Sequence, residues 1–538
     1  MSFRSVRASD VRSEPPVLSR FIPHIVVALG LMCGTASGQG AGDIRTYHTI
    51  TDPRTASALV ARVGTLAITA REFLLSYEFG PAFVKRSADS KKRYLEFMTN
   101  EKLLALEGYA RGLDHSASAR KSLSQVEADL ATEELYRDDV LKGVRVSGAE
   151  IEQGARQQLV SLSLRWLYAP DRARIADLRA LIASGVPFDS LFRSQNRDSA
   201  AGEERAMETT RFKLRRANPI VARMVDTLRA GIPSSPVRGP DGYYILQLTD
   251  LQMTAMPTET ELNKLRYDAG RAITEEKADS LSDLYVQRMM LARNPVIIRS
   301  SLNSLGGLLG RQVLKESLYN EWDLSRFARE GAQLERDTLV TLKNGSFLGR
   351  DFLDWYHARE TLLKFSLRSP DAFYASLEQL VWRMVRDRLL TRRAIARGLQ
   401  KRASVATQVT WWEQKVLYEM VKDSLARSIH IDSSAAGDFY RENRRRYLAH
   451  AGDTLSYDRA RDQVLKELFD TEFAKRLLHM VLALKQKYPV TVEQAVLSGL
   501  PVDTENDPKA IDVYTVKKGG IFPRPAFPVI DYAWQTWQ

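Results

Sequence analysis

Apolar positions recur at the spacing of a helix through most of this chain. Between residues 92 and 142, Tyr94, Phe97 and Met98 begin a series that repeats every three or four positions, and Gly112 interrupts it. Such a series places the apolar side chains on one face of a helix. It predicts two successive helices, the first of which ends near Gly112.

Two short polar patterns predict where helices begin. Thr69 is followed three positions later by Glu72, and Ser147 is followed in the same way by Glu150. In a capping box, the first side chain accepts a hydrogen bond from the backbone N–H three positions on, and the acidic side chain returns one. We therefore expect a helix after Thr69, preceded by a short strand within 60–68, and another helix after Ser147.

The pattern changes between residues 159 and 251. Residues 161–168 alternate like a strand, residues 175–184 and 221–228 have helical spacing, and residues 243–248 predict a second strand after a Gly-Pro-Asp-Gly turn. Helical spacing resumes at Glu259. The stretch predicts an α+β domain inserted into an otherwise helical chain.

The second half of the sequence repeats the first. Residues 339–353 match 60–74, and residues 388–399 match 102–113. Leu417-Tyr418 matches Leu135-Tyr136 in the same way, and the offset stays near about 280 residues, which indicates a duplicated unit. Between Tyr447 and Tyr457 there is no room for a second α+β insert.

These patterns predict a mainly α fold with one inserted α+β domain and a duplicated helical module. The expected segments are a signal peptide (1–41), a helical domain (55–158) completed by the helix 259–300, the α+β domain (159–251), a connecting helical segment (301–335), a second helical module without an insert (336–495) and an extended tail (496–538).

The N-terminus has the order of a secretory signal. Four arginines precede the apolar run from Ile22 to Met32, and small residues follow it. The run is shorter than the roughly 20 residues that span a bilayer. Met32 precedes Cys33, whereas a lipobox requires a small residue there, which argues against lipidation. We expect export to the periplasm or cell envelope of a bacterium, with no later transmembrane span.

Composition excludes some chemistry. The single cysteine, Cys33, permits no disulfide within the chain and no cysteine zinc site, and the seven histidines show no metal-binding spacing, so no metal or cofactor is expected. The formal net charge is +12. Nucleic acid, an anionic membrane surface and acidic clients are alternative partners for such a charge. Export argues against nucleic acid, while association with the envelope surface stays open.

Three motifs in the first half resemble a known family. They are the pattern at 60–73, the "L-L…A-x-G-L" helix at 103–113 and "V-x-V-S-x-x-E-I" at 144–151. Together they resemble the N-terminal chaperone domain of SurA-type periplasmic foldases. Residues 185–191, 228–237 and 239–248 resemble a parvulin (PpiC-type) peptidyl-prolyl cis-trans isomerase domain. The resemblance implies a folding factor in outer membrane protein biogenesis whose partners are unfolded or nascent exported polypeptides.

The catalytic pattern of that family is poorly kept. Trp166 and Tyr244 stand where parvulins carry histidines, and Ala217 and Val221 stand where a methionine and a phenylalanine line the proline pocket. No histidine or cysteine occurs from residue 159 to 251. The resemblance therefore implies no catalytic residue. It implies instead a substrate-binding apolar surface made by Trp166, Tyr168, Val221, Met224 and Tyr244.

Three functions remain open from the sequence. The first is a holdase chaperone for unfolded polypeptides with a degenerate isomerase domain. The second is an active prolyl isomerase, so the sequence alone leaves the question of enzyme activity undecided. The third is a structural or assembly partner of one envelope complex. An X-Pro isomerisation assay separates the second from the others, and breadth of clients separates the first from the third.

Overall fold

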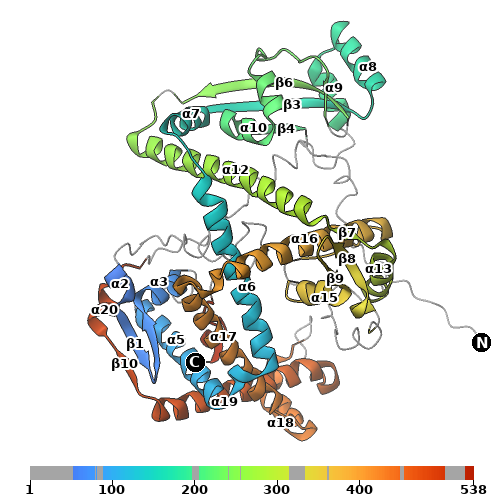
Figure 1. The fold of residues 1–538 in the computed structure, drawn as a ribbon. Helices are drawn as coiled ribbons and strands as arrows, with labels where there is room; N and C mark the ends of the chain where they lie inside the picture. Colours follow the sequence, from blue (N-terminus) through green and yellow to red (C-terminus); the bar gives the residue numbers. More distant parts are fainter. Residues whose placement is uncertain are drawn as a thin grey trace, which may run out of the picture. The chain divides into compact units, whose positions relative to one another are not determined.

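The computed structural model describes residues 53–78, 80, 89–196, 205–239, 242–254, 256–313, 332, 334–359, 363–448, 454–502 and 528–537. The expected signal peptide and Cys33 lie outside these residues. Within them, no helix combines the length and the apolar character that a membrane crossing requires. The described chain divides into two compact units, residues 144–280 and residues 53–143 with 281–537. The predicted fold class, mainly helical with one small α+β region, is confirmed (Figure 1).

The order of elements in the first half recurs in the second. The first half runs α2 (Pro53–Ser57), β1 (Leu59–Val63), β2 (Leu66–Thr69), α3 (Ala70–Glu78), α5 (Ser90–Ala110), a 3-10 turn (Leu113–His115), α6 (Ala117–Asp139), a 3-10 turn (Leu141–Gly143) and α7 (Gly148–Gln158). After the α+β elements come α12 (Glu259–Arg293), β7 (Val296–Ile297) and α13 (Arg299–Val313).

The second half runs β8 (Thr338–Leu342), β9 (Gly345–Leu348), α15 (Gly349–His357), α16 (Pro370–Ala396), a 3-10 turn (Leu399–Lys401), α17 (Ala403–Arg427), α18 (Ser433–Asn443), a 3-10 turn (Arg444–Arg446), α19 (Tyr457–Lys487), β10 (Val490–Val492) and α20 (Gln494–Gly499). The strand pair, the helices and the closing strand thus follow one another in the same order in both halves.

Each half completes the sheet of the other. Strand β10 pairs with β1, with Val63 opposite Val490, and β7 pairs with β8, with Ile297 opposite Val340. Figure 1 shows the orange-red β10 beside the blue β1. We expected the helix 259–300 to complete the first helical domain, but α19 and β10 do so instead. The reason lies in packing, because Tyr418 and Val421 of α17 are buried in the core around β1 and α5.

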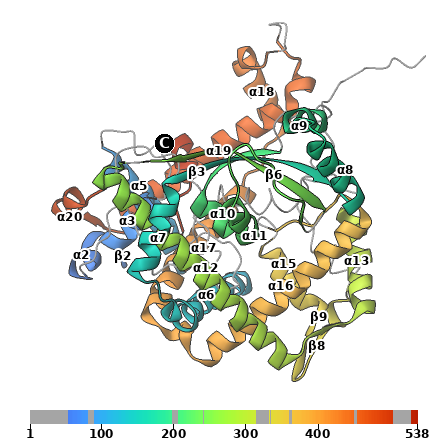
Figure 2. The ribbon, with the colours of Figure 1, turned by 90° about the horizontal axis from the view of Figure 1, so that it is seen from above.

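This exchange defines two lobes within one compact unit. The first lobe comprises β1, β2, α3 and α5 with α17, α19, β10, α20 and residues 528–537. The second lobe comprises β8, β9, α15 and α16 with α6, the end of α12, β7 and α13. Helices α6 and α17 pack against each other and join the lobes. In both views β8 and β9 lie near α13 and α16 (Figure 2).

Close packing of α5 on α17 holds the first lobe together. A Cβ added at Gly108 would lie 2.9 Å from the Cβ of Leu417, so the glycine permits this close approach. In the second lobe the described part of the expected connecting segment is helix α13. Its leucines belong to the core rather than to a linker: Leu302, Leu305, Leu308 and Leu309.

The α+β unit is built on a four-stranded antiparallel sheet in the order β4-β3-β6-β5. Its elements are β3 (Val160–Ala169), α8 (Arg172–Ala183), α9 (Phe188–Asn196), β4 (Ala206–Thr210), α10 (Arg211–Ala217), α11 (Pro219–Val225), β5 (Val237–Arg238) and β6 (Tyr243–Met253). Side chains on alternate positions of β3 and β6 face opposite sides of this sheet. Helices α8 and α9 cover one face, and α10 and α11 cover the other.

Helix α7 also belongs to this unit, although we expected it in the first helical domain. The predicted capping box is confirmed, since Ser147 accepts a bond from the Glu150 N–H and Glu150 accepts one from the Ser147 N–H at 2.8 Å. Glu150 also pairs with Lys277 of α12 at 2.5 Å. A Cβ on Gly154 would meet Ala269 at 2.9 Å, so α7 packs directly on α12.

The end of the predicted extended tail is folded. Residues 534–537 form the short helix α21 (Trp534–Trp537), and Ile530 and Trp534 are buried in the core of the first lobe. Periodicity could not reveal this, because the segment is too short to show a repeat. Residues 503–527 lie outside the described chain.

Candidate functional site

The five residues predicted to bind substrate lie together in the α+β unit. Trp166 and Tyr168 of β3 and Tyr244 of β6 share the face of the sheet that α10 and α11 cover, and Val221 and Met224 of α11 pack against them. Tyr168 and Tyr244 are directly opposite each other in the β3–β6 ladder, with ring centroids 5.3 Å apart. The sequence thus identified residues that the fold brings into one cluster.

Most of this cluster is buried. Trp166 is 4% exposed, Val221 5% and Tyr244 2%, whereas Tyr168 and Met224 are half-buried. The rings at the positions of the family's histidines are therefore core residues of the sheet. Only the edges of Tyr168 and Met224 are accessible in the described structure.

Polar groups border the accessible edge. Gln195 accepts a bond from the Tyr168 N–H at 3.1 Å and donates one to the Tyr168 carbonyl at 3.0 Å. The Arg205 guanidinium lies 5.9 Å from the centre of the Tyr168 ring. Arginine binds strongly to carboxylates and aromatic rings but stays protonated near neutral pH, so it does not shuttle protons there. This edge suits binding rather than proton transfer.

Apolar side chains are exposed elsewhere on this unit. Leu251 and Met253 at the end of β6 are 45% and 68% exposed, and Met256 just beyond is 92% exposed. Ile220 and Ile232 are also more than half exposed. Single exposed apolar residues are ordinary, but three within six positions of one segment form a local apolar surface.

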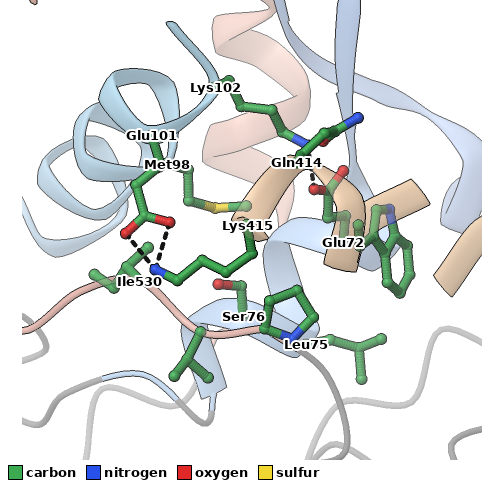
Figure 3. Close-up of a pocket in the computed structure, with 12 residues that line it drawn as sticks. Glu72, Leu75, Ser76, Met98, Glu101, Lys102, Gln414, Lys415 and Ile530 are labelled. Carbon is green, nitrogen blue, oxygen red and sulfur yellow. Dashed lines mark hydrogen bonds and ion pairs between the residues drawn. The ribbon is translucent and has the colours of Figure 1, made fainter. Parts of the chain in front are cut away.

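A second site, which sequence reasoning missed, lies in the first lobe. It is a pocket of about 50 Å³ between α3, α5, α17 and residues 528–530 (Figure 3). The polar side chains that line it come from three helices: Glu72 and Ser76 of α3, Glu101 and Lys102 of α5, and Gln414 and Lys415 of α17. Lys415 bonds both carboxylate oxygens of Glu101 at 2.9 Å. Lys102 bonds Glu72 at 2.5 Å. Thr69 accepts the Glu72 N–H at 3.3 Å, which is the first half of the predicted capping box.

The C-terminal segment 528–537 is anchored at this site. The Asp531 N–H donates to Glu101 Oε1 at 2.6 Å, and the Trp534 indole N–H donates to the same oxygen at 3.3 Å. The Asp531 carboxylate accepts bonds from Lys422 Nζ at 2.6 Å and the Tyr418 hydroxyl at 2.9 Å. Trp534 is completely buried. One buried carboxylate and one lysine therefore fix both the backbone and the side chains of the segment.

Burial and ion pairing have opposite effects on the pKa values of Glu101 and Asp531. Burial raises the pKa of Glu101, although the nearby Lys415 ammonium lowers it in part. Burial alone would raise the pKa of Asp531 as well, but Lys422 and the Ala533 N–H bring it below its ordinary value. Asp531 is therefore ionised at neutral pH and pairs with the Lys422 cation.

The second lobe has a buried carboxylate at the corresponding position, with different hydrogen-bond partners. Asp387 occupies the position just before Arg388, as Glu101 does before Lys102. Asp387 is buried and accepts a bond from the Trp355 indole N–H at 3.2 Å. A pocket of about 200 Å³ lies beside it, lined by Asp129, Arg359 and Arg388 among others. Burial raises the pKa of Asp387 to about 7, although Arg386 and Arg359 oppose this.

One signal for these sites was present in the sequence. Residues 102–113 and 388–399 match, and an acidic residue immediately precedes each match. An acidic residue at a position flanked by apolar helical positions indicates a buried, paired carboxylate. Nothing in the local sequence of 528–537 indicates that it reaches Glu101. Among the described residues, no cluster of histidine, cysteine or acidic side chains is arranged to hold a metal ion.

Comparison with known proteins gives structural likenesses only. No family model matches the chain, and no curated protein matches it. Among solved structures, the peptidylprolyl isomerase PrsA from Bacillus anthracis is 11% identical, with 36% of this chain and 96% of that chain covered and a TM-score of 0.21. PrsA from Bacillus cereus is 16% identical, with coverages of 43% and 92% and a TM-score of 0.23. The foldase protein PrsA from Streptococcus pneumoniae is 11% identical, with coverages of 41% and 89% and a TM-score of 0.21.

Proposed function

We propose that this chain is an exported folding factor that holds unfolded polypeptides and has a degenerate prolyl isomerase domain. The observation that carries the proposal is the buried aromatic cluster of the α+β unit. In the domain whose motifs resemble a parvulin, Trp166 and Tyr244 replace the histidines and are core residues. The SurA-type motifs of the first half support the chaperone part of the proposal.

The physical argument concerns the twisted amide. Rotation about a prolyl bond has a barrier of about 20 kcal/mol, and a catalyst must bind the twisted form more tightly than the planar one. That preference needs a fitted proline pocket and placed polar groups. In this unit Val221 is buried against Trp166, and histidine is absent from residues 159–251. Little remains to favour the twisted amide.

Holding an unfolded chain makes weaker demands. It requires accessible apolar surface next to polar surface, with modest affinity so that the client can leave. The Leu251–Met256 segment and the accessible edge at Tyr168 and Met224 provide such surface in the α+β unit. Leu284 and Leu291 of α12, which are 46% and 73% exposed, provide it in the other unit. Tyr168 and Met224, which are half-buried, would contact the client, while the buried Trp166, Val221 and Tyr244 would support them from the core.

An aggregation assay tests the holding function. Several unrelated, chemically unfolded proteins are diluted into buffer with and without the full mature chain, and light scattering is followed. We expect suppression for all of them at near-stoichiometric ratios. Suppression of none of them refutes the holdase, and suppression of one alone favours an assembly partner.

An X-Pro tetrapeptide assay tests the loss of catalysis. We expect the isomerisation rate with the full chain to stay at the uncatalysed rate. Ala217 and Val221 are smaller than the methionine and phenylalanine of the parvulin pocket, and Trp166 and Tyr244 replace its histidines. A rate similar to that of an ordinary parvulin contradicts this and identifies the chain as an active isomerase.

A further inference from the structure

The groove that holds residues 528–537 is made by elements that already contact one another. Helix α5 packs on α17 and α19, and α17 packs on α19. Gly108 brings α5 and α17 close together beside the groove. Glu101, Lys415 and Lys422 are therefore placed by helix packing, and the C-terminal segment is not needed to position them.

The segment is held by groups that another polypeptide with an acidic residue and a tryptophan can supply. One backbone N–H and one indole N–H bond Glu101, and one carboxylate bonds Lys422 and Tyr418. Apolar and aromatic contacts add to these bonds, and Ile530 is buried in the core of the first lobe. Trp534 lies 6.3 Å from Tyr418 and 5.2 Å from Trp537, measured between ring centroids. The ring of Trp537 lies 5.4 Å from Phe473 of α19 in a T-shaped arrangement.

In the second lobe, the buried carboxylate is bonded by an indole from the lobe's own core. There the indole that bonds the buried carboxylate Asp387 comes from Trp355, on the lobe's own helix α15. The corresponding position of the first lobe, two residues beyond the matched segment, is Ser76. The first lobe therefore obtains its indole from a separate segment, residues 528–537.

We propose that this groove of the first lobe is a polypeptide-binding site for segments of the form acidic-x-x-Trp-x-x-Trp, and that the chain's own C-terminal segment is its resident occupant. The proposal rests on the polypeptide-holding function above, for which it names a site and a sequence preference. A client segment with the same pattern competes with residues 528–537 for Glu101 and Lys422.

The spacing of the pattern follows from the geometry. Asp531, Trp534 and Trp537 are three positions apart, and residues three apart share one side of a helical turn. Asp531 also accepts a bond from the Ala533 N–H at 2.9 Å, so the acidic residue begins the turn that presents both indoles. Tyr532, between them, is 46% exposed and takes part in none of the bonds to Glu101 and Lys422 described above.

Peptide binding to variants of the full chain tests the proposal. The probe is a fluorescein-labelled synthetic peptide with the sequence of residues 528–538, and its affinity is measured by fluorescence anisotropy. Intramolecular competition at roughly millimolar effective concentration weakens the apparent affinity of the wild-type chain. We expect Asp531→Ala and Trp534→Ala to bind the probe at least tenfold more tightly than wild type, and Tyr532→Ala to bind it like wild type. Equal affinity for all four chains, with unchanged circular dichroism, overturns the proposal.

A measurement on the wild-type chain avoids any folding defect of the variants. Hydrogen–deuterium exchange of residues 528–537 is followed by mass spectrometry with and without an excess of unlabelled peptide. Displacement of the resident segment makes its backbone amides exchange faster, and a peptide with both tryptophans replaced by alanine leaves exchange unchanged. Unchanged exchange with the intact peptide overturns the proposal.

The aggregation assay separates this inference from the proposed function. Broad suppression of aggregation without peptide exchange refutes the groove and leaves the holdase intact. Peptide exchange without any suppression supports the groove and refutes the general holdase. We expect both, with Trp534→Ala suppressing aggregation of aromatic-rich clients better than wild type.

Discussion

The two lobes place a buried carboxylate at the same position and satisfy it in different ways. In the first lobe Glu101 is bonded by Lys415 and by the indole of Trp534, which arrives from the C-terminal segment. In the second lobe Asp387 is bonded by Arg386 and by the indole of Trp355, on the neighbouring helix. A buried carboxylate requires a cation and hydrogen-bond donors in either case.

The difference shows how one repeated helical pattern can place a carboxylate in a closed core or beneath a docked segment. Where the indole belongs to the lobe's own helix, the carboxylate is part of the permanent core. Where it belongs to a distant segment, the same carboxylate becomes a docking point. Position in the chain, rather than chemistry, distinguishes the two sites.

The largest expected effect comes from removing each indole in turn. Trp355 is 1% exposed and lies in the central cluster of the second lobe, so Trp355→Ala should lower the free energy of unfolding by about 3–5 kcal/mol. Trp534 is equally buried, but its loss is limited to the free energy that docks its segment. We expect Trp534→Ala to lower the free energy of unfolding by about half as much as Trp355→Ala, or less.

Urea denaturation followed by circular dichroism measures both variants on the full chain. Tyr532→Ala is the control within the same segment, because Tyr532 is 46% exposed and takes part in none of the bonds to Glu101 and Lys422 described above. An equal loss for Trp355→Ala and Trp534→Ala contradicts the comparison, since it makes the C-terminal segment as integral to the fold as α15.

The order of elements was accessible from the sequence because it depends on local spacing. The strand at 161–168, the helix at 175–184 and the cap at Ser147 all appear within a few residues of their predicted bounds. Which copy completes which sheet was not accessible. Both copies end in a long helix and a short strand with the same pattern, so periodicity predicts the pairing of a strand but not its partner.

The candidate sites, like the fold, were predictable only in part. Trp166, Tyr168 and Tyr244 were selected through the resemblance to parvulins, and the fold places them on one face of the sheet. Their burial depends on α10, a helix that local spacing did not reveal. The groove at Glu101 depends on contacts across hundreds of positions, such as that from Asp531, and no local pattern encodes them.

The two lobes should also differ in how their stability depends on pH, an effect smaller than that of removing the indoles. Asp387 has a folded-state pKa of about 7, against an ordinary value of 3.8. The folded state therefore holds the proton more tightly than the unfolded state between these values. Stability from this group is complete below about pH 4 and falls as the pH rises to about 7, by about 2–4 kcal/mol.

Asp387→Asn tests this assignment because it keeps an acceptor for Trp355 and cannot ionise. The unfolding free energy of wild type minus that of the variant is measured from pH 4 to pH 8. We expect the difference to become more negative with rising pH across this window. A difference that does not change with pH rules out a neutral Asp387 and places an ionised carboxylate in the second lobe.

The smallest expected effect concerns the helix pairs beneath the two sites. Gly108 of α5 corresponds to Ala394 of α16, which is fully buried in the second lobe. In an unchanged backbone, Gly108→Ala would put its Cβ 2.9 Å from the Cβ of Leu417, an atom next to the backbone that cannot swing away, so α5 and α17 must separate slightly. Overpacking of this kind costs about 1–3 kcal/mol, and the gain of about 1 kcal/mol in helix propensity offsets part of it. We expect a net loss of about 1 kcal/mol and, because Glu101 and Lys415 lie on the two separated helices, weaker docking of residues 528–537.

Hydrogen exchange of residues 528–537 measures the weaker docking. Ala394→Gly is the control, because it should leave the exchange of 528–537 unchanged. A stabilised Gly108→Ala chain with unaltered exchange would show that the close contact of α5 and α17 does not shape the groove.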